Sequence, residues 1–272
     1  MTSHTVRGPD GRTLAVREAG DPGGPAIVAH HGSPGSGSLF RSEVESAQQH
    51  GLRLIAYDRP GFGGSTPHDG RRVADAAADV AAILDALGVE RFATYGTSGG
   101  GPHALACAAL LEGRCAAAAT IAGVGAADAP DLDWFEGMGE GNQAEFGAAV
   151  KGREALVPLL EEEAAGMLRA EPEQLADAIR PHLSDVDATA LTGEFAEHLH
   201  GQITAGLAPG VEGWVEDDLA FVGPWGFDLA SIDVPVLVWQ GEEDLMVPGA
   251  HGHWLRSTSP RPTAAWCRER VT

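Results

Sequence analysis

A serine between glycines forms the motif of this chain best suited to chemistry. Residues 96–100 read Gly-Thr-Ser-Gly-Gly, between an apolar run (92–95) and a stretch of small residues with helical character (101–111). A serine on a sharp turn from strand to helix needs very small neighbours, because the turn crowds the backbone. Such a turn holds the hydroxyl of Ser98 out in a cleft, where it can attack an electrophilic carbon as a nucleophile.

Two backbone amides are predicted to receive the negative charge that develops when Ser98 attacks a carbonyl. The N–H of Gly99 follows the nucleophile directly, at the positive end of the predicted helix. The second N–H is expected from Ser33, in the loop 31–35 (HGSPG) that follows the apolar run 26–29. An ordinary Gly/Pro turn is the alternative interpretation of this loop.

Short apolar runs alternate with helical patterns along most of the chain, which predicts an α/β fold with a doubly wound, mostly parallel sheet. A Pro-Asp-Gly turn at 9–11 predicts a β-hairpin near the N-terminus. The segment 128–227 breaks the alternation and predicts a helical cap over the strand ends, with 1–127 and 228–272 forming the core. The expected parallel strands are 26–29, 53–57, 92–95, 116–124 and 234–239, and the expected helices are 39–50, 73–87, 101–111 and 248–255.

Charge and composition exclude several classes of partner. The net charge is −21 and the only lysine is Lys151, which argues against binding nucleic acid or an anionic membrane surface. The segment 128–227 holds about half of the 39 acidic residues. Most of these are expected to form a solvated face, and the alternative is that they hold the N-terminal amine of a substrate.

The chain is expected in the cytoplasm. No apolar run reaches the roughly 18–20 residues that span a bilayer, and the N-terminus has no signal-peptide pattern. Cys107, Cys115 and Cys267 lack the spacing of metal ligands, and buried inert thiols suit a reducing compartment.

Three motifs, taken together, resemble those of the α/β-hydrolase superfamily, in its branch with a His-Gly-x-Pro oxyanion loop and a serine nucleophile. They are 31–34 (HGSP), 58–65 (DRPGFGGS) and 96–100 (GTSGG), in the order and approximate spacing of the family. The resemblance covers residues 10–250. It implies the α/β-hydrolase fold with an inserted cap, a small-molecule substrate, and neither metal nor cofactor.

The resemblance also implies an acid that orients a catalytic histidine. Asp244 matches this position, at the end of the segment 234–244 (VPVLVWQGEED). A buried carboxylate there fixes the tautomer of the imidazole and stabilises the imidazolium. Asp128 stands at the alternative acid position that some members of the superfamily use.

The histidine that completes the family's triad is not found at its position. Only His251 and His253 follow Asp244, and the predicted helix 248–255 puts them on the side of the sheet. The tail 256–272 lacks an apolar strand pattern, so the last strand and helix of the fold are expected to be missing. A shifted reading frame, which would restore a Gly-His pair, and a natural terminus of a degenerate relative are the two explanations.

These observations predict a serine hydrolase of small esters, amides or related acyl substrates, impaired by the absence of its histidine. Serine-type perhydrolases use the same triad. A noncatalytic protein that retains the pocket is the first alternative. A further alternative is an aminopeptidase similar to proline iminopeptidases, which the loop 32–35 loosely resembles. The sequence makes no prediction of oligomeric state.

Overall fold

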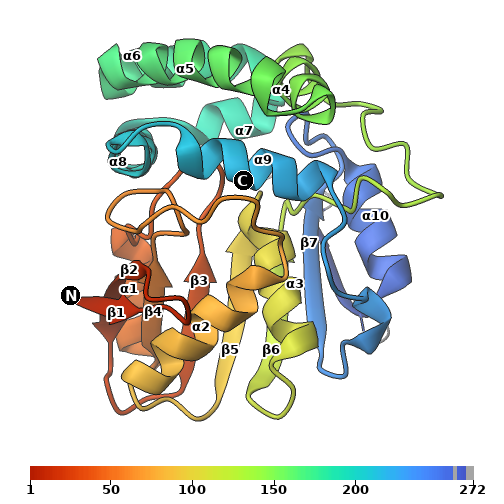
Figure 1. Cartoon of the computed structure of the whole chain (residues 1–272). Helices are drawn as coiled ribbons and strands as arrows, with labels where there is room; N and C mark the ends of the chain where they lie inside the picture. Colours follow the sequence, from red (N-terminus) through yellow and green to blue (C-terminus); the bar gives the residue numbers. More distant parts are fainter. Residues whose placement is uncertain (260–261, 268–272) are drawn as a thin grey trace.

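The computed structural model describes residues 1–259 and 262–267, and its centre is an eight-stranded sheet with the order β1-β2-β4-β3-β5-β6-β7-β8 (Figure 1). Strands β3 to β8 run parallel, and β1 and β2 form the predicted antiparallel hairpin. The predicted α/β class and the mostly parallel sheet are therefore confirmed. The strands are β1 (Thr2–Arg7), β2 (Thr13–Gly20), β3 (Ala26–His30), β4 (Arg53–Tyr57), β5 (Phe92–Thr97), β6 (Cys115–Ile121), β7 (Val236–Gly241) and β8 (Pro262–Cys267).

The expectation that the last strand is missing is wrong. The backbone of β8 pairs in parallel with β7, with Pro262 opposite Val236 and Cys267 opposite Gly241. Strand pairing at a sheet edge uses backbone groups, so it does not require the apolar pattern that the tail lacks. The expected loss of a closing helix, and with it the question of the reading frame, concerns residues outside the described ranges.

Alternate residues of β4 face the two sides of the sheet. Ile55 and Tyr57 pack in the main core with α2 and α3, whereas Leu54 and Ala56 pack in the smaller core beside α1. Each helix around the sheet overlaps the range that the sequence predicts. They are α1 (Arg41–Gln49), α2 (Asp75–Ala86), α3 (Gly100–Leu110) and α10 (Gly249–Thr258).

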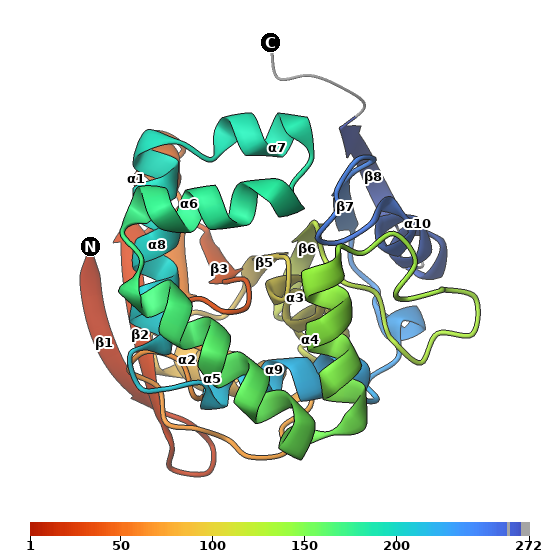
Figure 2. The same ribbon diagram turned by 90° about the horizontal axis from the view of Figure 1, so that it is seen from above.

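A helical layer, α4–α9, connects β6 to β7 and lies over the end of the sheet at which the parallel strands finish (Figures 1 and 2). It falls inside the segment 128–227; the division into core and cap domains stays a prediction. No helix in the described part of the chain has both the length and the apolar character needed to cross a membrane. The layer consists of α4 (Glu140–Lys151), α5 (Arg153–Arg169), α6 (Pro172–Ile179), the 3-10 turn η1 (Arg180–His182), α7 (Asp185–Ala190), α8 (Gly193–Leu207) and α9 (Glu212–Val222).

A buried cluster of charges joins this layer to the sheet. Asp217 of α9 lies 2.6 Å from the guanidinium of Arg59 and 2.5 Å from that of Arg71, and all three side chains are buried. Burial alone raises the pKa of Asp217, but the two arginines outweigh it and hold that pKa below its usual range. The cluster therefore stays charged at neutral pH.

The strand β5 runs directly into α3, and the two elements approach most closely at glycines. A Cβ on Gly96 would lie 2.0 Å from the carbonyl oxygen of Gly100, and one on Gly100 would lie 2.2 Å from the carbonyl oxygen of His30. No side chain fits at either distance, so glycine is required at both positions.

Removing the charge of Asp217 is expected to destabilise the fold strongly. Asp217→Asn leaves two buried arginines without a counter-charge, which should lower the free energy of unfolding by about 3–5 kcal/mol. The loss should be complete at pH 7 and shrink below the unfolded-state pKa of about 3.9, because the folded-state pKa is lower still. Denaturant titrations at several pH values measure both effects.

Glu212→Gln is the matched control on the same helix. Glu212 pairs with Arg153 at the exposed surface, so its loss should cost at most about 1 kcal/mol. Equal losses for Asp217→Asn and Glu212→Gln would show that the buried cluster has no special weight.

Gly96→Ala is expected to lower the free energy of unfolding by about 1–3 kcal/mol or more, because the new methyl group collides with the first turn of α3. Gly147→Ala is the control, since Gly147 lies in α4 with open space around the Cβ position. That substitution should stabilise the protein by about 0.5–1 kcal/mol. Thermal unfolding of both variants measures the difference, and similar melting temperatures would contradict the close approach.

Candidate active site

The turn between β5 and α3 holds Ser98 in an unusual backbone conformation. Its φ is 51°, in the left-handed region that residues other than glycine seldom adopt. The N–H of Ser98 donates to the carbonyl of Ile121 (2.8 Å), and the N–H of Gly101 donates to the carbonyl of Ser98 (2.9 Å). These bonds fix the sharp turn that the glycines predict. Among the described residues, the Ser98 hydroxyl has no hydrogen-bond partner.

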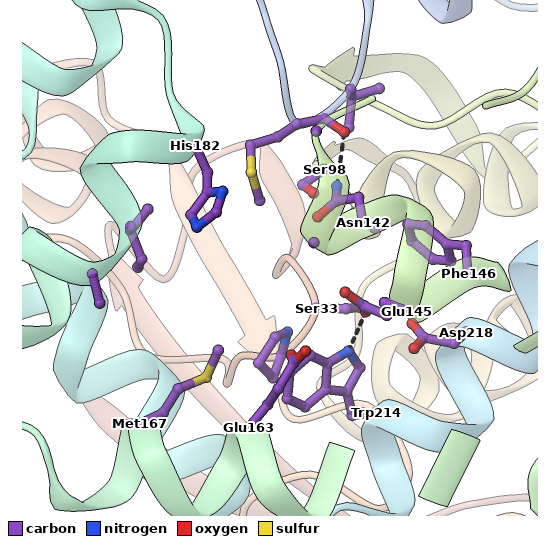
Figure 3. Close-up of a pocket in the computed structure, with 18 of the residues that line it drawn as sticks. Ser33, Ser98, Asn142, Glu145, Phe146, Glu163, Met167, His182, Trp214 and Asp218 are labelled. Atoms are coloured by element: carbon purple, nitrogen blue, oxygen red, sulfur yellow. Dashed lines mark hydrogen bonds between the residues drawn. The ribbon is translucent and has the colours of Figure 1, made fainter. Parts of the chain in front are cut away.

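Ser98 borders a cavity of about 460 Å³ between the sheet and the helical layer. Ser33 and Gly99 line the same cavity, so the structure brings together three of the four residues that the sequence singles out. The opposite walls come from α4, α5 and α9 of the layer, which supply Glu145, Glu163 and Asp218 (Figure 3).

The two predicted oxyanion donors lie side by side. A Cβ on Gly99 would come within 2.6 Å of the Oγ of Ser33, and a Cβ on Gly32 would lie 3.6 Å from the Cβ of Ser98. Within the described part of the chain, the N–H groups of Ser33 and Gly99 donate to no acceptor. Two unpaired donors beside a serine hydroxyl can bind the oxyanion of a tetrahedral intermediate.

The loop that carries Ser33 is held by the buried charge cluster. The guanidinium of Arg59 donates to the carbonyls of His31 and Gly32 and to the Oγ of Ser33 (2.9 Å for Ser33). The hydroxyl of Ser33 in turn donates to Asp217. One ion pair therefore fixes the loop relative to α9.

Asp244 does not line the cavity. Its Oδ1 accepts from the N–H groups of Met246 and Val247, each at 2.9 Å, and its Oδ2 accepts from Gln240 at 3.2 Å. Burial raises its pKa. None of these partners is a histidine, although Met246 and Val247 themselves border the cavity. The alternative acid, Asp128, is exposed.

All eleven histidines lie within residues 1–259. Among the hydrogen bonds of the described residues, none joins a histidine to Ser98 or Asp244. His251 lies on α10, as predicted, where its Nδ1 accepts from the N–H of Gly125 (2.9 Å) and its Nε2 donates to the carbonyl of Trp134 (3.0 Å). Burial lowers its pKa to about 4. His251 therefore serves as a neutral link between loops.

Two buried histidines near the site also form hydrogen bonds with the backbone. The Nδ1–H of His31 donates to the carbonyl of Gly32 (2.6 Å), and its Nε2 accepts from the N–H of Arg59 (3.1 Å). His103 bonds the carbonyl of Gly99 through Nδ1 (2.9 Å). Burial holds the pKa of both imidazoles below the usual range. Both are structural partners of the backbone.

Among the described residues, His182 is the one histidine that lines the cavity, and no sequence motif pointed to it. It belongs to η1, in the helical layer, and is exposed to solvent. Figure 3 shows its ring on the side of the cavity away from Asp218. Its position depends on how the layer packs, and no local sequence signal carries that information.

The acidic residues of the layer are not all solvated. Glu145 and Glu163 are partly buried and Asp218 is fully buried, and all three line the cavity. Burial raises the pKa of each, that of Glu145 to about 7. No lysine or arginine lines the cavity within the described ranges. For these three residues the predicted solvated face is wrong, because the layer folds them inward.

The cysteines add little chemistry to the site. Cys107 and Cys115 are buried and free, and burial raises the pKa of both thiols, as expected for inert side chains. The side chain of Cys267 lies outside the described set. Within the part of the chain that the structure describes, no group of three acidic, histidine or cysteine side chains is arranged to hold a metal ion.

Proteins with similar sequences include peroxidases and hydrolases. A non-heme haloperoxidase of Rhodococcus erythropolis is 29% identical over 90% of this chain and 84% of its own length. A non-heme chloroperoxidase of Streptomyces lividans is 36% identical, but the match covers only 44% of each chain. The matched region covers less than half the length of several relatives. It covers 36% of the length of epoxide hydrolase A of Mycobacterium tuberculosis.

Solved structures share the fold over almost the whole chain. A bromoperoxidase from Bacillus anthracis superposes with a TM-score of 0.70 at 21% identity, covering 97% of this chain and 91% of that one. An esterase from a Rhodococcus species gives a TM-score of 0.67 at 25% identity, covering 98% and 90%. The sequence model of the protein family described as 'alpha/beta hydrolase fold' matches residues 25–261 of this chain. The chain belongs to the α/β hydrolase fold family.

Proposed function

We propose that this protein is a serine hydrolase whose nucleophile is Ser98 and whose substrates are small esters, amides or related acyl compounds. The observation that carries the proposal is the strained turn at Ser98, which borders a cavity together with two unpaired N–H groups. The hydrolase and esterase names among similar proteins support the general class. The expected location in the cytoplasm stays a prediction.

In this mechanism the Oγ of Ser98 attacks the carbonyl carbon of the substrate, and its proton passes to solvent water, which later protonates the leaving group. The carbonyl oxygen becomes an oxyanion, which the N–H groups of Ser33 and Gly99 bind. The intermediate then collapses, the protonated leaving group departs, and an acyl-enzyme remains on Ser98. Water hydrolyses this ester and releases the acid.

Turnover is expected to be slow, because no imidazole is bonded to Ser98 or held by Asp244. A site without its general base retains roughly 10³-fold acceleration over water from the oxyanion hole and binding. The same observation favours a second candidate, a noncatalytic protein that binds a small ligand in this cavity. The two candidates differ in whether Ser98 forms a covalent adduct.

Ser98 is expected to be the residue that a fluorophosphonate labels. Incubation should add one phosphonyl group per chain, and Ser98→Ala should abolish the adduct in an intact-mass measurement. Ser46→Ala is the control, since Ser46 is exposed on α1, and it should be labelled like the parent. An unlabelled parent chain would favour the noncatalytic candidate, and an adduct that survives Ser98→Ala would contradict the nucleophile.

His182→Gln is expected to leave the hydrolysis of p-nitrophenyl acetate unchanged. The imidazole of His182 is exposed and no carboxylate is hydrogen-bonded to it in the described residues, so its tautomer is not fixed for proton transfer. A tenfold fall in rate would instead assign the role of general base to His182.

A further inference from the structure

Three consecutive acidic residues of α9 are buried, and their surroundings differ. Glu216 pairs with Arg153 at 2.7 Å and accepts from the N–H of Gly70 at 2.7 Å. Asp217 pairs with two arginines, as described above. Asp218 is fully buried and lines the cavity, and no arginine, lysine or histidine of the described residues pairs with it; the carboxyl group that acts on it is that of Glu145 from α4. The structure thus leaves one carboxyl of the three without a counter-charge.

Two further carboxyl groups, from other helices, line the same cavity as Asp218. Figure 3 shows Glu145 of α4 beside Asp218, with Glu163 of α5 on another wall of the cavity. The Oε1 of Glu145 accepts from the indole N–H of Trp214 at 2.7 Å. Three helices of the layer therefore each supply a carboxyl group to the lining of one part of the cavity, here called its acidic end, and Trp214 lines the cavity as well.

Burying these carboxyl groups in ionised form without a bound cation is costly in free energy. A buried carboxylate is costly unless a cation or several donors compensate it, and the alternative is to bind a proton. Burial and the charge of Glu145 raise the pKa of Asp218, and burial raises the pKa of Glu145 to about 7. The charged groups facing the pair are Glu163 from α5 and Asp217 from α9 itself, whose charge the arginines neutralise. A cation that binds at the acidic end favours the ionised carboxyls and so displaces protons from them.

The chemistry of the walls selects an organic cation over a metal ion. The acidic side chains of the described residues are not arranged to ligate a metal. Aromatic and thioether side chains, which suit an ammonium group on a carbon skeleton, line the same cavity. They are Phe146, Met167, Trp214 and Phe221.

We propose that the cavity takes substrates that carry a protonated amine, which Glu145, Glu163 and Asp218 bind while the carbonyl carbon lies at Ser98. Esters and amides of amino-substituted acids have this combination of groups. The position of the carbonyl rests on the proposed function. The recognition of the ammonium group does not, because it depends on the acidic end of the cavity alone.

Calorimetric titration of the Ser98→Ala variant tests the recognition without turnover. Benzylamine, which is cationic at pH 7, should bind at least tenfold more tightly than benzyl alcohol, its neutral analogue of similar shape. Binding should also release protons, because the ammonium group favours the ionised carboxyls. Titration in two buffers of different ionisation enthalpy measures that release. Equal affinities for the two compounds would overturn the proposal.

Asp218→Asn and Glu145→Gln, each added to Ser98→Ala, identify the carboxyls. Either change should weaken benzylamine binding at least tenfold, leave benzyl alcohol binding unchanged, and reduce the proton release. Glu161→Gln is the control, because Glu161 is exposed on the same helix as Glu163 and does not line the cavity. Unchanged benzylamine affinity in both carboxyl variants would overturn the assignment. Denaturant unfolding verifies that each variant is folded.

The outcome separates this inference from the proposed function. If fluorophosphonate fails to label Ser98 but benzylamine is preferred, the acidic end stands and the hydrolase proposal fails. If Ser98 is labelled but the cavity does not distinguish benzylamine from benzyl alcohol, the hydrolase proposal stands and the substrate class is wrong.

Discussion

The buried contact of Asp217 with Arg59 and Arg71 is the constraint on which the candidate site depends. It connects α9 of the helical layer with the segments that follow β3 and β4, although these parts are far apart in the sequence. Without it, the loop of Ser33 would lose the side chains that anchor it to α9. A buried ion pair contributes little net stability against an apolar replacement, but it fixes one geometry, because each charge requires its partner.

That geometry sets opposite demands at the two ends of the cavity. Near Ser98, unpaired N–H groups suit a developing negative charge, while elsewhere in the cavity lining three carboxyls suit a positive one. A substrate with both features would satisfy both ends at once. The site lacks an evident proton acceptor for the Ser98 hydroxyl. Asp244 accepts hydrogen bonds from N–H groups of its own turn, and His251 is bonded to the backbone of two loops.

The sequence predicted those parts of the structure that depend on the local conformation of the backbone. A glycine-flanked serine between an apolar run and a helix specifies its own turn, and short apolar runs specify buried parallel strands. The acidic end was not predictable in this way, since residues 216–218 look alike in the sequence and only the packing of α9 gives each a different environment. The strand β8 was missed because an edge strand needs only backbone pairing.

The most direct test of the account is a crystal structure of the phosphonyl adduct of this protein. The account predicts that the phosphonyl group is attached to the Oγ of Ser98, with its oxygen within about 2.7–3.1 Å of the N–H nitrogens of Ser33 and Gly99. An oxygen directed into solvent or towards the carboxyls, with either N–H left unpaired, would contradict the claim that the buried ion pair positions an oxyanion site.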